Sequence, residues 1–454
     1  MKRGLALILC LLICFCSIGL TGCGTEIGGE TGNNHGVKTD NKTGNGYSGN
    51  SVELDPYDME LLYTICLEDL MDRQDLRNVI ADFSLELFRE SYTENDNNVI
   101  SPLSATIALG ILAMGTDGDS RTEIESVFAK HYNSEKNDGL LDAVLAYLCQ
   151  YQEILIQRGT NINVSPIKLN NSLWIRNEEN RLNVEKNYIY EIYEYFRCRA
   201  FSSPFDESTV NDINYWCEEA TAGQIKEMLD EIPYDAVLYI LNALSFDGQW
   251  QRVYEEDDIK EFATFTTEKG EIQNCTMMYS SEGRYLQDEN TKGFIKNYKD
   301  GFSFVALLPS ESIKIKDYVD SLNGEKWRNL FEISEFGEVF CGLPKFSAEK
   351  EIGLVPMLKT MGIKDIFIPN KANLSKIGES SFGNLYASDV RQKVVIDVND
   401  KGTKAAAVTM IQVKDTAIAM PVEPKEVILD RPFVYAIIDN ETNTPLFLGT
   451  VESM

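Results

Sequence analysis

Residues 400–416 carry the pattern that decides the fold, and they read D-K-G-T-K-A-A-A-V-T-M-I-Q-V-K-D-T. With a period of two, one face holds only small or β-branched, uncharged side chains, namely Thr403, Ala405, Ala407, Thr409, Ile411 and Val413. This period is that of a strand with one face against a core, and the Val, Thr and Ile residues favour a strand over a helix. Gly402 supplies a joint where unusual dihedral angles carry no Cβ penalty. We therefore predict a strand that inserts between existing strands.

Other segments occur in a fixed order around this stretch. They are 98–104 (N-V-I-S-P-L-S), 214–216 (N-Y-W), 221–225 (T-A-G-Q-I), 241–250 (L-N-A-L-S-F-D-G-Q-W), 304–309 (F-V-A-L-L-P), 343–346 (L-P-K-F), 361–367 (M-G-I-K-D-I-F), 430–433 (D-R-P-F) and 445–451 (P-L-F-L-G-T-V). Together with residues 400–416, this series resembles the serpin family over residues 78–454.

The resemblance implies an α+β fold, with one large and two smaller β-sheets, about nine helices and an exposed reactive loop. Length alone favours two or three domains, but the serpin fold uses its whole length as one unit. The implied activity is that of a suicide substrate, which traps a serine or cysteine protease when the cleaved loop enters the main sheet. The alternative is a serpin-fold protein without inhibitory activity that serves as a binding or scaffold module. The composition of the hinge favours the inhibitor.

The resemblance also implies roles for single residues. The hinge consists of Asp400, Gly402, Thr403, Ala405, Ala406 and Ala407, and the breach contains Trp250. A polar shutter beneath the sheet consists of Ser101, Ser104, Asn242 and Gln392. Asp400 replaces an expected glutamate, and Gln392 stands where histidine is common. Because glutamine both donates and accepts hydrogen bonds, we expect a working shutter with altered pH behaviour. Capping of a helix start is the alternative role for Ser101 and Ser104.

The position of the cleaved bond follows from the family's count along the loop, which gives Thr416–Ala417. The segment up to residue 430 is longer than the family pattern, so Ile418–Ala419 and Ala419–Met420 remain open. Lys414–Asp415 falls short of the count, and Pro421 disfavours cleavage after Met420. The remaining bonds offer small or aliphatic side chains, which favours an elastase-like or subtilisin-like protease.

The N-terminus has the pattern of a bacterial lipoprotein signal. Lys2 and Arg3 precede an apolar run over residues 5–20, shorter than the ~20 residues of a spanning helix. Residues 20–23 (L-T-G-C) resemble a lipobox, which makes Cys23 the lipid attachment site; an uncleaved anchor and an ordinary cleavage site are the alternatives. We divide the chain into a signal peptide (1–22), lipid attachment and a flexible tether (23–56) and a serpin domain (57–454). The protein is then exported and anchored on the outer face of a bacterial membrane.

Composition and charge exclude several functions. A net charge of −29, from 42 basic and 71 acidic residues, disfavours nucleic acid, and residues 121–160 hold no basic excess for heparin. The two histidines, His35 and His131, neighbour no nucleophile motif or zinc motif. We therefore expect no enzymatic activity, no metal and no cofactor, and we expect a monomer.

Six cysteines follow Cys23, namely Cys66, Cys149, Cys198, Cys217, Cys275 and Cys341. Export would permit disulfides, but a large domain does not need them and no pair has C-x-x-C spacing. Several of the six lie in apolar surroundings, so we predict mostly buried, free thiols.

Overall fold

The structure is a computed structural model that describes residues 50–56, 70–132, 139–158, 166–179, 181–403 and 425–454. All of these belong to one unit, Asn45–Met454. Cys23, Cys66, Ala405, Ala406, Ala407 and the Thr416–Ala417 bond lie outside the described residues.

The helices of the described residues follow from apolar periodicity and local caps. They are α1 (Gln74–Ser91), α2 (Pro102–Met114), α3 (Gly118–Ala129), α4 (Leu140–Arg158), α5 (Lys186–Phe196), α6 (Glu207–Ala220), α7 (Ile315–Ser321), α8 (Gly324–Glu332) and α9 (Val355–Met361). Helix α2 begins at Pro102 after the cap residue Ser101 and is apolar on every side, so it lies in the core. None of the helices in the described ranges is both long and apolar enough to cross a bilayer.

The strands of the described residues are short or of moderate length. They are β1 (Val52–Leu54), β2 (Val99–Ile100), β3 (Ile167–Arg176), β4 (Asn183–Val184), β5 (Cys198–Ser203), β6 (Leu238–Phe246), β7 (Gly248–Gln249), β8 (Ile259–Thr266), β9 (Ile272–Gln287), β10 (Thr291–Asn297), β11 (Phe302–Pro309), β12 (Glu335–Pro344), β13 (Phe346–Gly353), β14 (Gly378–Glu379), β15 (Arg391–Val398), β16 (Gly402–Thr403), β17 (Lys425–Ile428), β18 (Phe433–Asp439) and β19 (Pro445–Val451).

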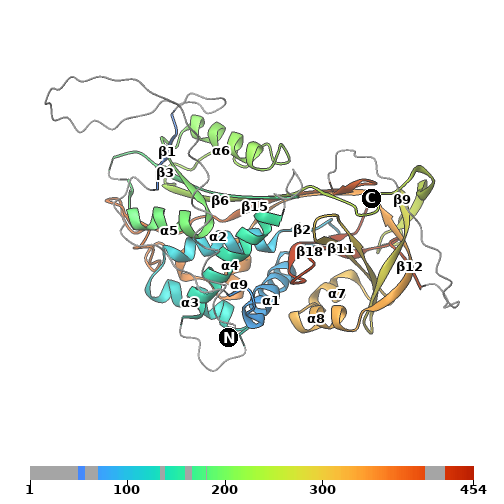
Figure 1. The fold of residues 1–454 in the computed structure, drawn as a ribbon. Helices are drawn as coiled ribbons and strands as arrows, with labels where there is room; N and C mark the ends of the chain where they lie inside the picture. Colours follow the sequence, from blue (N-terminus) through green and yellow to red (C-terminus); the bar gives the residue numbers. More distant parts are fainter. Residues whose placement is uncertain (1–49, 57–69, 133–138, 159–165, 180, 404–424) are drawn as a thin grey trace, which may run out of the picture. The chain divides into compact units, whose positions relative to one another are not determined.

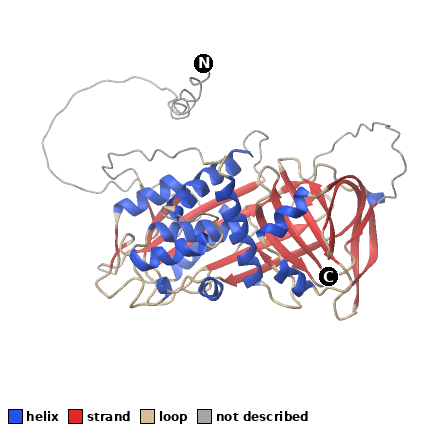
Figure 2. Cartoon of the chain, turned by 90° about the horizontal axis from the view of Figure 1, so that it is seen from below, coloured by secondary structure: helices blue, strands red, loops and turns tan. Residues whose placement is uncertain are grey.

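These strands form one nine-stranded sheet, two four-stranded sheets and one two-stranded sheet. The nine-stranded sheet has the order β17-β12-β9-β10-β11-β18-β19-β2, with β8 paired to β9. The two four-stranded sheets have the orders β1-β5-β3-β6 and β13-β15-β16-β7. Helices cover faces of these sheets, as α2 and α6 do for β6, and most of them gather on one side of the picture in Figure 2. The α+β fold class is confirmed.

Strands β6 and β15 lie side by side, although they belong to different sheets (Figure 1). In the described part of the chain, no ladder of backbone hydrogen bonds joins β6 to β15. Helix α2 lies below β6 and helix α6 covers the opposite face (Figure 1). We call the space between these two unjoined strands the strand gap.

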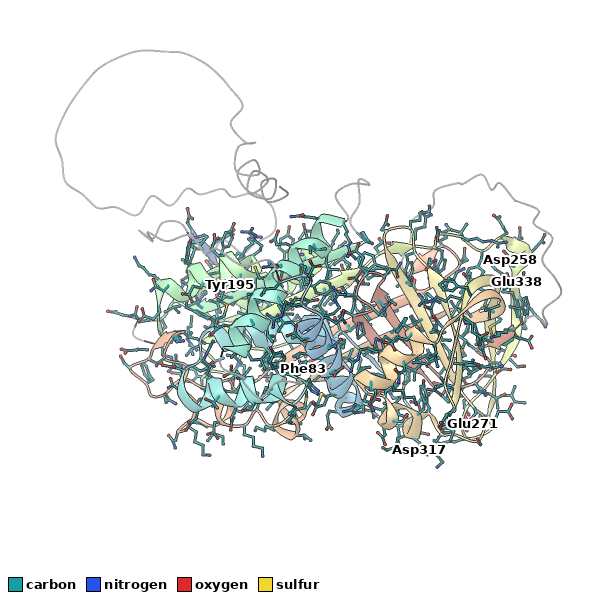
Figure 3. The ribbon with its side chains drawn as sticks, turned by 60° about the horizontal axis from the view of Figure 1, so that its bottom comes forward. Phe83, Tyr195, Asp258, Glu271, Asp317 and Glu338 are labelled. Atoms are coloured by element: carbon teal, nitrogen blue, oxygen red, sulfur yellow. The ribbon has the colours of Figure 1, made fainter. Side chains whose placement is uncertain are left out.

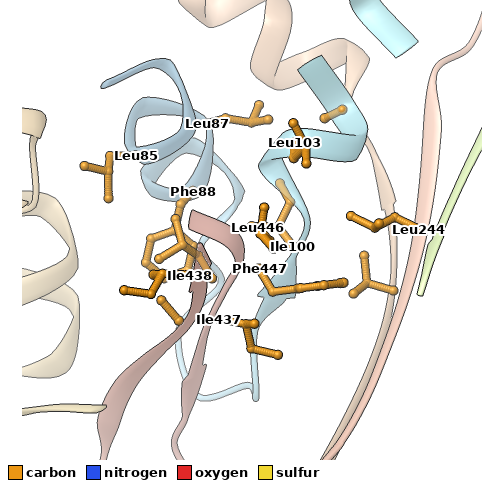
Figure 4. Close-up of a cluster of buried hydrophobic side chains, with 14 of the residues drawn as sticks. Leu85, Leu87, Phe88, Ile100, Leu103, Leu244, Ile437, Ile438, Leu446 and Phe447 are labelled. Carbon is orange, nitrogen blue, oxygen red and sulfur yellow. The ribbon is translucent and has the colours of Figure 1, made fainter. Parts of the chain in front are cut away.

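The core is one continuous cluster that reaches from the helices to the sheets. Figure 4 shows Phe88 of α1, Leu103 of α2, Leu244 of β6, Ile437 of β18 and Phe447 of β19 meeting in it. Every residue of β11, β18 and β19 is buried. Charged side chains such as Glu271, Asp317 and Glu338 lie on the outside, whereas Phe83 is enclosed by helices (Figure 3). The high net charge is therefore carried by a solvated surface over an apolar interior.

One part of the predicted tether is structured. Val52–Leu54, which sequence composition places in the flexible segment 23–56, forms β1 and pairs antiparallel with β5. The guanidinium of Arg199 on β5 also forms an ion pair with Glu53. The order of β1 is explained by its backbone pairing with the otherwise open edge of β5. The sequence did not predict this strand, because three residues are too few to show a period of two.

Candidate functional site

The beginning of residues 400–416 already lies at one end of the strand gap. Thr403 pairs antiparallel with Val398 of β15 on one side and with Gly248 of β7 on the other. Gly402 pairs with Gln249 on the same side as the Gly248 contact. Strand β16 therefore bridges the two sides of the gap, since β7 follows β6 in the chain.

The side chain of Thr403 points into the core. It is 1% exposed, and its hydroxyl lies 2.6 Å from the hydroxyl of Tyr298. The Tyr298 ring stacks on Trp250 with a centroid separation of 4.3 Å. Thr403 thus occupies a small polar niche inside an aromatic cluster, where a charged side chain would lack water and a partner.

Gly402 is required for a different reason from the predicted one. The φ angle of Gly402 is not in the left-handed region, so its backbone conformation does not require glycine. A Cβ at this position would instead lie 2.0 Å from the backbone oxygen of Gly248. Close approach of two backbones, and not a flexible joint, therefore selects glycine here.

Asp400 forms the base of the hinge through an ion pair. Its Oδ1 lies 2.5 Å from Nζ of Lys345, in the loop between β12 and β13. Burial alone would raise the pKa of Asp400, but the hydrogen bond from Lys345 and backbone hydrogen bonds outweigh it and lower the pKa. Aspartate, although shorter than the glutamate of the family pattern, still reaches this lysine.

Trp250 holds the backbone just before the hinge. Its indole Nε1 donates to the carbonyl of Asn399 at 2.8 Å, and its backbone N–H donates to the carbonyl of Lys401. The ammonium of Lys296, which is 1% exposed, lies 5.4 Å from the Trp250 ring and 2.7 Å from Glu282. The ring thereby fixes the direction in which the chain enters β16.

Three of the four predicted shutter residues come together at α2. The backbone N–H of Ser101 donates to Oε1 of Gln392 at 3.0 Å, and Nε2 of Gln392 donates to the Ser101 carbonyl at 2.8 Å. The Ser101 hydroxyl donates to the carbonyl of Leu446 and accepts from the backbone N–H of Ser104. Capping of α2 and the contact with β15 therefore use the same serine.

The fourth shutter residue, Asn242 on β6, has different partners. Its Nδ2 donates to Oδ1 of Asn171 on β3, whose own Nδ2 donates to Gln152 and to the carbonyl of Phe196. The Oδ1 of Asn242 is buried and accepts no hydrogen bond from the described residues. An acceptor in this state is costly. Counted from the pairing of Thr403 with Val398 and Gly248, Asn242 on β6 and Gln392 on β15 stand at the same level of the strand gap.

Sequence reasoning missed several contributors to this site. Tyr298, Lys296, Asn171 and Glu282 carry no motif, and only Lys345 falls in a quoted segment, L-P-K-F. Each acts through a contact with a residue distant in the chain, which no local pattern records.

The described residues offer neither a cluster of metal ligands nor an exposed thiol at this site. Within the described ranges, no three His, Cys, Asp or Glu side chains are grouped so that they could hold a metal ion. Cys149, Cys198, Cys217, Cys275 and Cys341 are free and buried, which confirms the prediction for these five. Burial raises the pKa of Cys217 to about 12, so its reactive thiolate form is scarce at neutral pH.

Comparison with known proteins gives a consistent result. The family model described as "Serpin (serine protease inhibitor)" matches residues 78–454. The chain is 27% identical to neuroserpin of Homo sapiens over 391 residues, which covers 82% of this chain and 90% of that protein. It is 29% identical to Serpin B13 of Homo sapiens over 395 residues, covering 83% and 98%. It is also 28% identical to an uncharacterized serpin-like protein of Methanosarcina acetivorans, covering 85% and 88%.

Solved structures extend the comparison to the fold. The thermophilic serpin tengpin in its native state has 37% sequence identity and a TM-score of 0.76, over 86% of this chain and 96% of that one. The complex of thyroxine-binding globulin with thyroxine has a TM-score of 0.69 over 83% and 99%. With 22% identity, it shares the fold alone.

Proposed function

The chain belongs to the serpin family, and from this premise we propose that it inhibits a protease as a suicide substrate. The protease nucleophile attacks the carbonyl carbon of Thr416 and forms an acyl-enzyme, and the amine of Ala417 leaves. The freed arm that begins at Gly402 then fills the strand gap and carries the acylated protease with it. Serpins are generally protease inhibitors and not enzymes, and the proposal assigns this chain no catalytic residue of its own.

The register of β16 is the observation that carries the proposal. Because Thr403 pairs with both Val398 and Gly248, each following residue has a defined position if the strand continues. Ala405 would lie between Ile396 and Phe246, and Ala407 between Val394 and Leu244. Small alanines would thus face large side chains that already line the gap.

The same register places a polar residue of the inserted strand between polar residues of its two neighbours. Thr409 would lie between Gln392 and Asn242, whose Oδ1 accepts no hydrogen bond from the described residues. A threonine hydroxyl can donate to this oxygen. Along this register, the alanines lie beside apolar residues of the gap and the threonine lies beside polar ones. This agreement supports insertion in this register.

The energy of insertion is sufficient for inhibition. Each ladder hydrogen bond contributes about 0.5–1.5 kcal/mol, and about ten residues would bond on both sides and bury an apolar face. The total is of order ten kcal/mol. Displacing the reacting groups of the protease by ~1 Å costs ~10²-fold in rate, so deacylation slows at least by that factor.

We assign the target to proteases that accept small or aliphatic side chains, elastase-like or subtilisin-like. This rests on the sequence around Thr416, because the bond lies outside the described residues. Subsite differences of this kind contribute about 1–3 kcal/mol. The acidic surface also suits a partner with basic groups around its active site.

We also propose that the mature chain begins at a lipidated Cys23 and is held at the outer face of a bacterial membrane. Acyl chains contribute ~0.8 kcal/mol per buried CH₂, so several chains anchor stably. A flexible coil over residues 24–51, which precede β1, would have a reach of about 30 Å, enough to keep a bound protease clear of the bilayer. Membrane fractionation of the wild type and of Cys23→Ala tests this: the wild type should sediment with membranes, and release of both with an unmodified N-terminus contradicts the anchor.

A protease panel tests the inhibitory function. The mature chain is incubated with elastase-like, subtilisin-like and trypsin-like proteases, and the products are separated in SDS. An SDS-resistant complex with one of the first two, and a released C-terminal peptide that begins at Ala417, supports the proposal. Cleavage without any complex contradicts it and favours the serpin-fold protein without inhibitory activity.

A further inference from the structure

The strand gap ends in a cavity at the side away from β16. The cavity has a volume of about 370 Å³ and opens between β6 and the segment that leads into β15. Its walls include Leu109 and Leu112 of α2, Leu238 and Ile240 of β6, and Val390 just before β15. These aliphatic side chains give an apolar body of the size that binds small molecules in proteins.

The cavity wall includes a buried arginine, which lies between the exposed ring of Phe382 in the same wall and the exposed ring of Tyr234 beside it. Arg181 is 7% exposed, and its guanidinium carbon lies 4.6 Å from the ring centroid of Phe382 and 5.2 Å from that of Tyr234. Phe382 and Tyr234 are 66% and 79% exposed. The exposed rings of Phe382 and Tyr234 and the buried guanidinium of Arg181 together form an amphipathic surface beside the cavity.

The positive charge of Arg181 is only partly compensated. Its Nη2 donates to the carbonyl of Tyr234, while its Nε is buried without a hydrogen-bond acceptor in the described residues. The nearest carboxylate, Glu178, lies 3.6 Å from this Nε but 2.9 Å from Nε of a second buried arginine, Arg176. Two buried arginines therefore share one half-exposed carboxylate.

The other charges at the mouth do not cancel this excess. Asp389 is ion-paired to Arg391, which also pairs with Glu351. Asp235 lines the mouth but is exposed to water, and solvent screens its field. The cavity thus combines an apolar body with one under-compensated, desolvated guanidinium, which prefers a carboxylate as partner.

We infer that this cavity binds an amphipathic carboxylate, with the chain or ring between β6 and Val390 and the carboxylate at Arg181. In the register of β16, Ile411 and Val413 would lie beside Ile240 and Leu238, the residues that line the cavity. A bound ligand occupies the space that these two side chains need. It therefore halts insertion before completion. The acyl-enzyme is then hydrolysed, and the inhibitor is released as a cleaved substrate. This consequence rests on the proposed function.

Direct titration tests the site without any protease. Dodecanoate is titrated calorimetrically into the full mature chain, with dodecanol as the uncharged control. We expect one site per chain, with weaker binding of dodecanol. Arg181→Gln should weaken dodecanoate binding about tenfold, the effect of one charge-assisted hydrogen bond, whereas Arg199→Gln, on an exposed arginine paired with Glu53, should leave it unchanged.

A second variant fills the cavity. Ala108 is half-buried on α2 and lines the cavity, so Ala108→Phe should abolish binding while thermal unfolding reports that the variant is folded. No binding by the wild type overturns the site, and so does equal binding by the wild type and the folded Ala108→Phe. Equal binding of dodecanol and dodecanoate, unaffected by Arg181→Gln, overturns the role of the anion.

The coupling to insertion needs the protease. With saturating dodecanoate, the fraction of wild-type chain that is cleaved without forming a complex should rise, and the rise should be absent in Ala108→Phe. An unchanged fraction with proven binding overturns the coupling. If no protease forms a complex, the proposed function fails, but the titration still decides whether the cavity binds a carboxylate.

Discussion

Strands β18 and β6 differ in how many neighbours hydrogen-bond to them. Strand β18 pairs with β11 on one side and β19 on the other, and all seven of its residues are buried. Strand β6 pairs along its length with β3 alone within the described ranges, and Leu238–Ile240 at its start are only half-buried. One sheet is complete, while the other keeps an unused edge.

The unused edge has a functional meaning because edges are normally protected. An open strand edge invites pairing with other chains, and this one is covered by α6 and bridged at one end by β16. Within the proposed mechanism, forming the missing ladder of hydrogen bonds after cleavage releases the free energy that drives inhibition. The complete sheet supplies the rigid frame against which the incomplete one changes.

The largest expected effect is that of Thr403→Arg, which should expel β16 from the end of the strand gap, so that insertion cannot start there. A charged side chain at this buried position costs about 3 kcal/mol or more. Cleavage by the protease should continue, while the SDS-resistant complex disappears and cleaved inhibitor accumulates. Thr403→Ser keeps the hydroxyl near Tyr298 and should inhibit normally; equal complex yields from the Arg variant and the wild type would remove the insertion model.

Next in size is Gly402→Ala, which separates β16 from β7. The new methyl group overlaps the Gly248 oxygen, a cost of about 1–3 kcal/mol, so the urea midpoint of the intact protein should fall. Gly353→Ala on β13 is the control, because a Cβ there meets no atom within 4 Å. Equal midpoints for the two variants would mean that β16 is not held in the sheet.

A smaller effect is expected for Thr409→Val, which tests the register. The substitution removes one hydroxyl and should lower the stability of the loop-cleaved form by about 1 kcal/mol, because Asn242 loses its donor. The intact form should be unaffected, and Thr409→Ser should behave as wild type. Equal losses in the intact and cleaved forms would show that Thr409 does not enter at the level of Asn242.

The smallest effect belongs to Asp400→Asn at the hinge base. The Asp400 and Lys345 side chains are about one-third exposed, so the ion pair contributes only about 0.5 kcal/mol. Because the folded-state pKa of Asp400 is lowered below its usual 3.8, this stability is present above that value and is lost as pH falls through the lowered pKa. Urea unfolding of wild type and variant should differ at pH 7 and converge in acid; a constant difference would assign the effect to something other than the carboxylate charge.

The sequence predicted the α+β fold because the diagnostic segments are local and ordered along the chain. It indicated the direction of the Thr403 side chain through a period of two, which requires only neighbouring residues. It did not indicate the partners of Asn242 or Asp400, since Asn171 and Lys345 lie far away in the chain. Nor did it reveal where pairing is interrupted, because a buried strand has the same apolar pattern with one neighbour or with two.

Hydrogen exchange of β6 and β15, before and after loop cleavage, tests the central claim most directly. Amides that face the strand gap should exchange quickly in the intact protein and become protected after cleavage at Thr416–Ala417, as new ladder bonds form. Amides of β18 serve as the internal reference and should stay protected in both forms. Unchanged exchange along Leu238–Phe246 and Arg391–Val398 after complete cleavage would contradict the account, because the gap would then have remained unfilled.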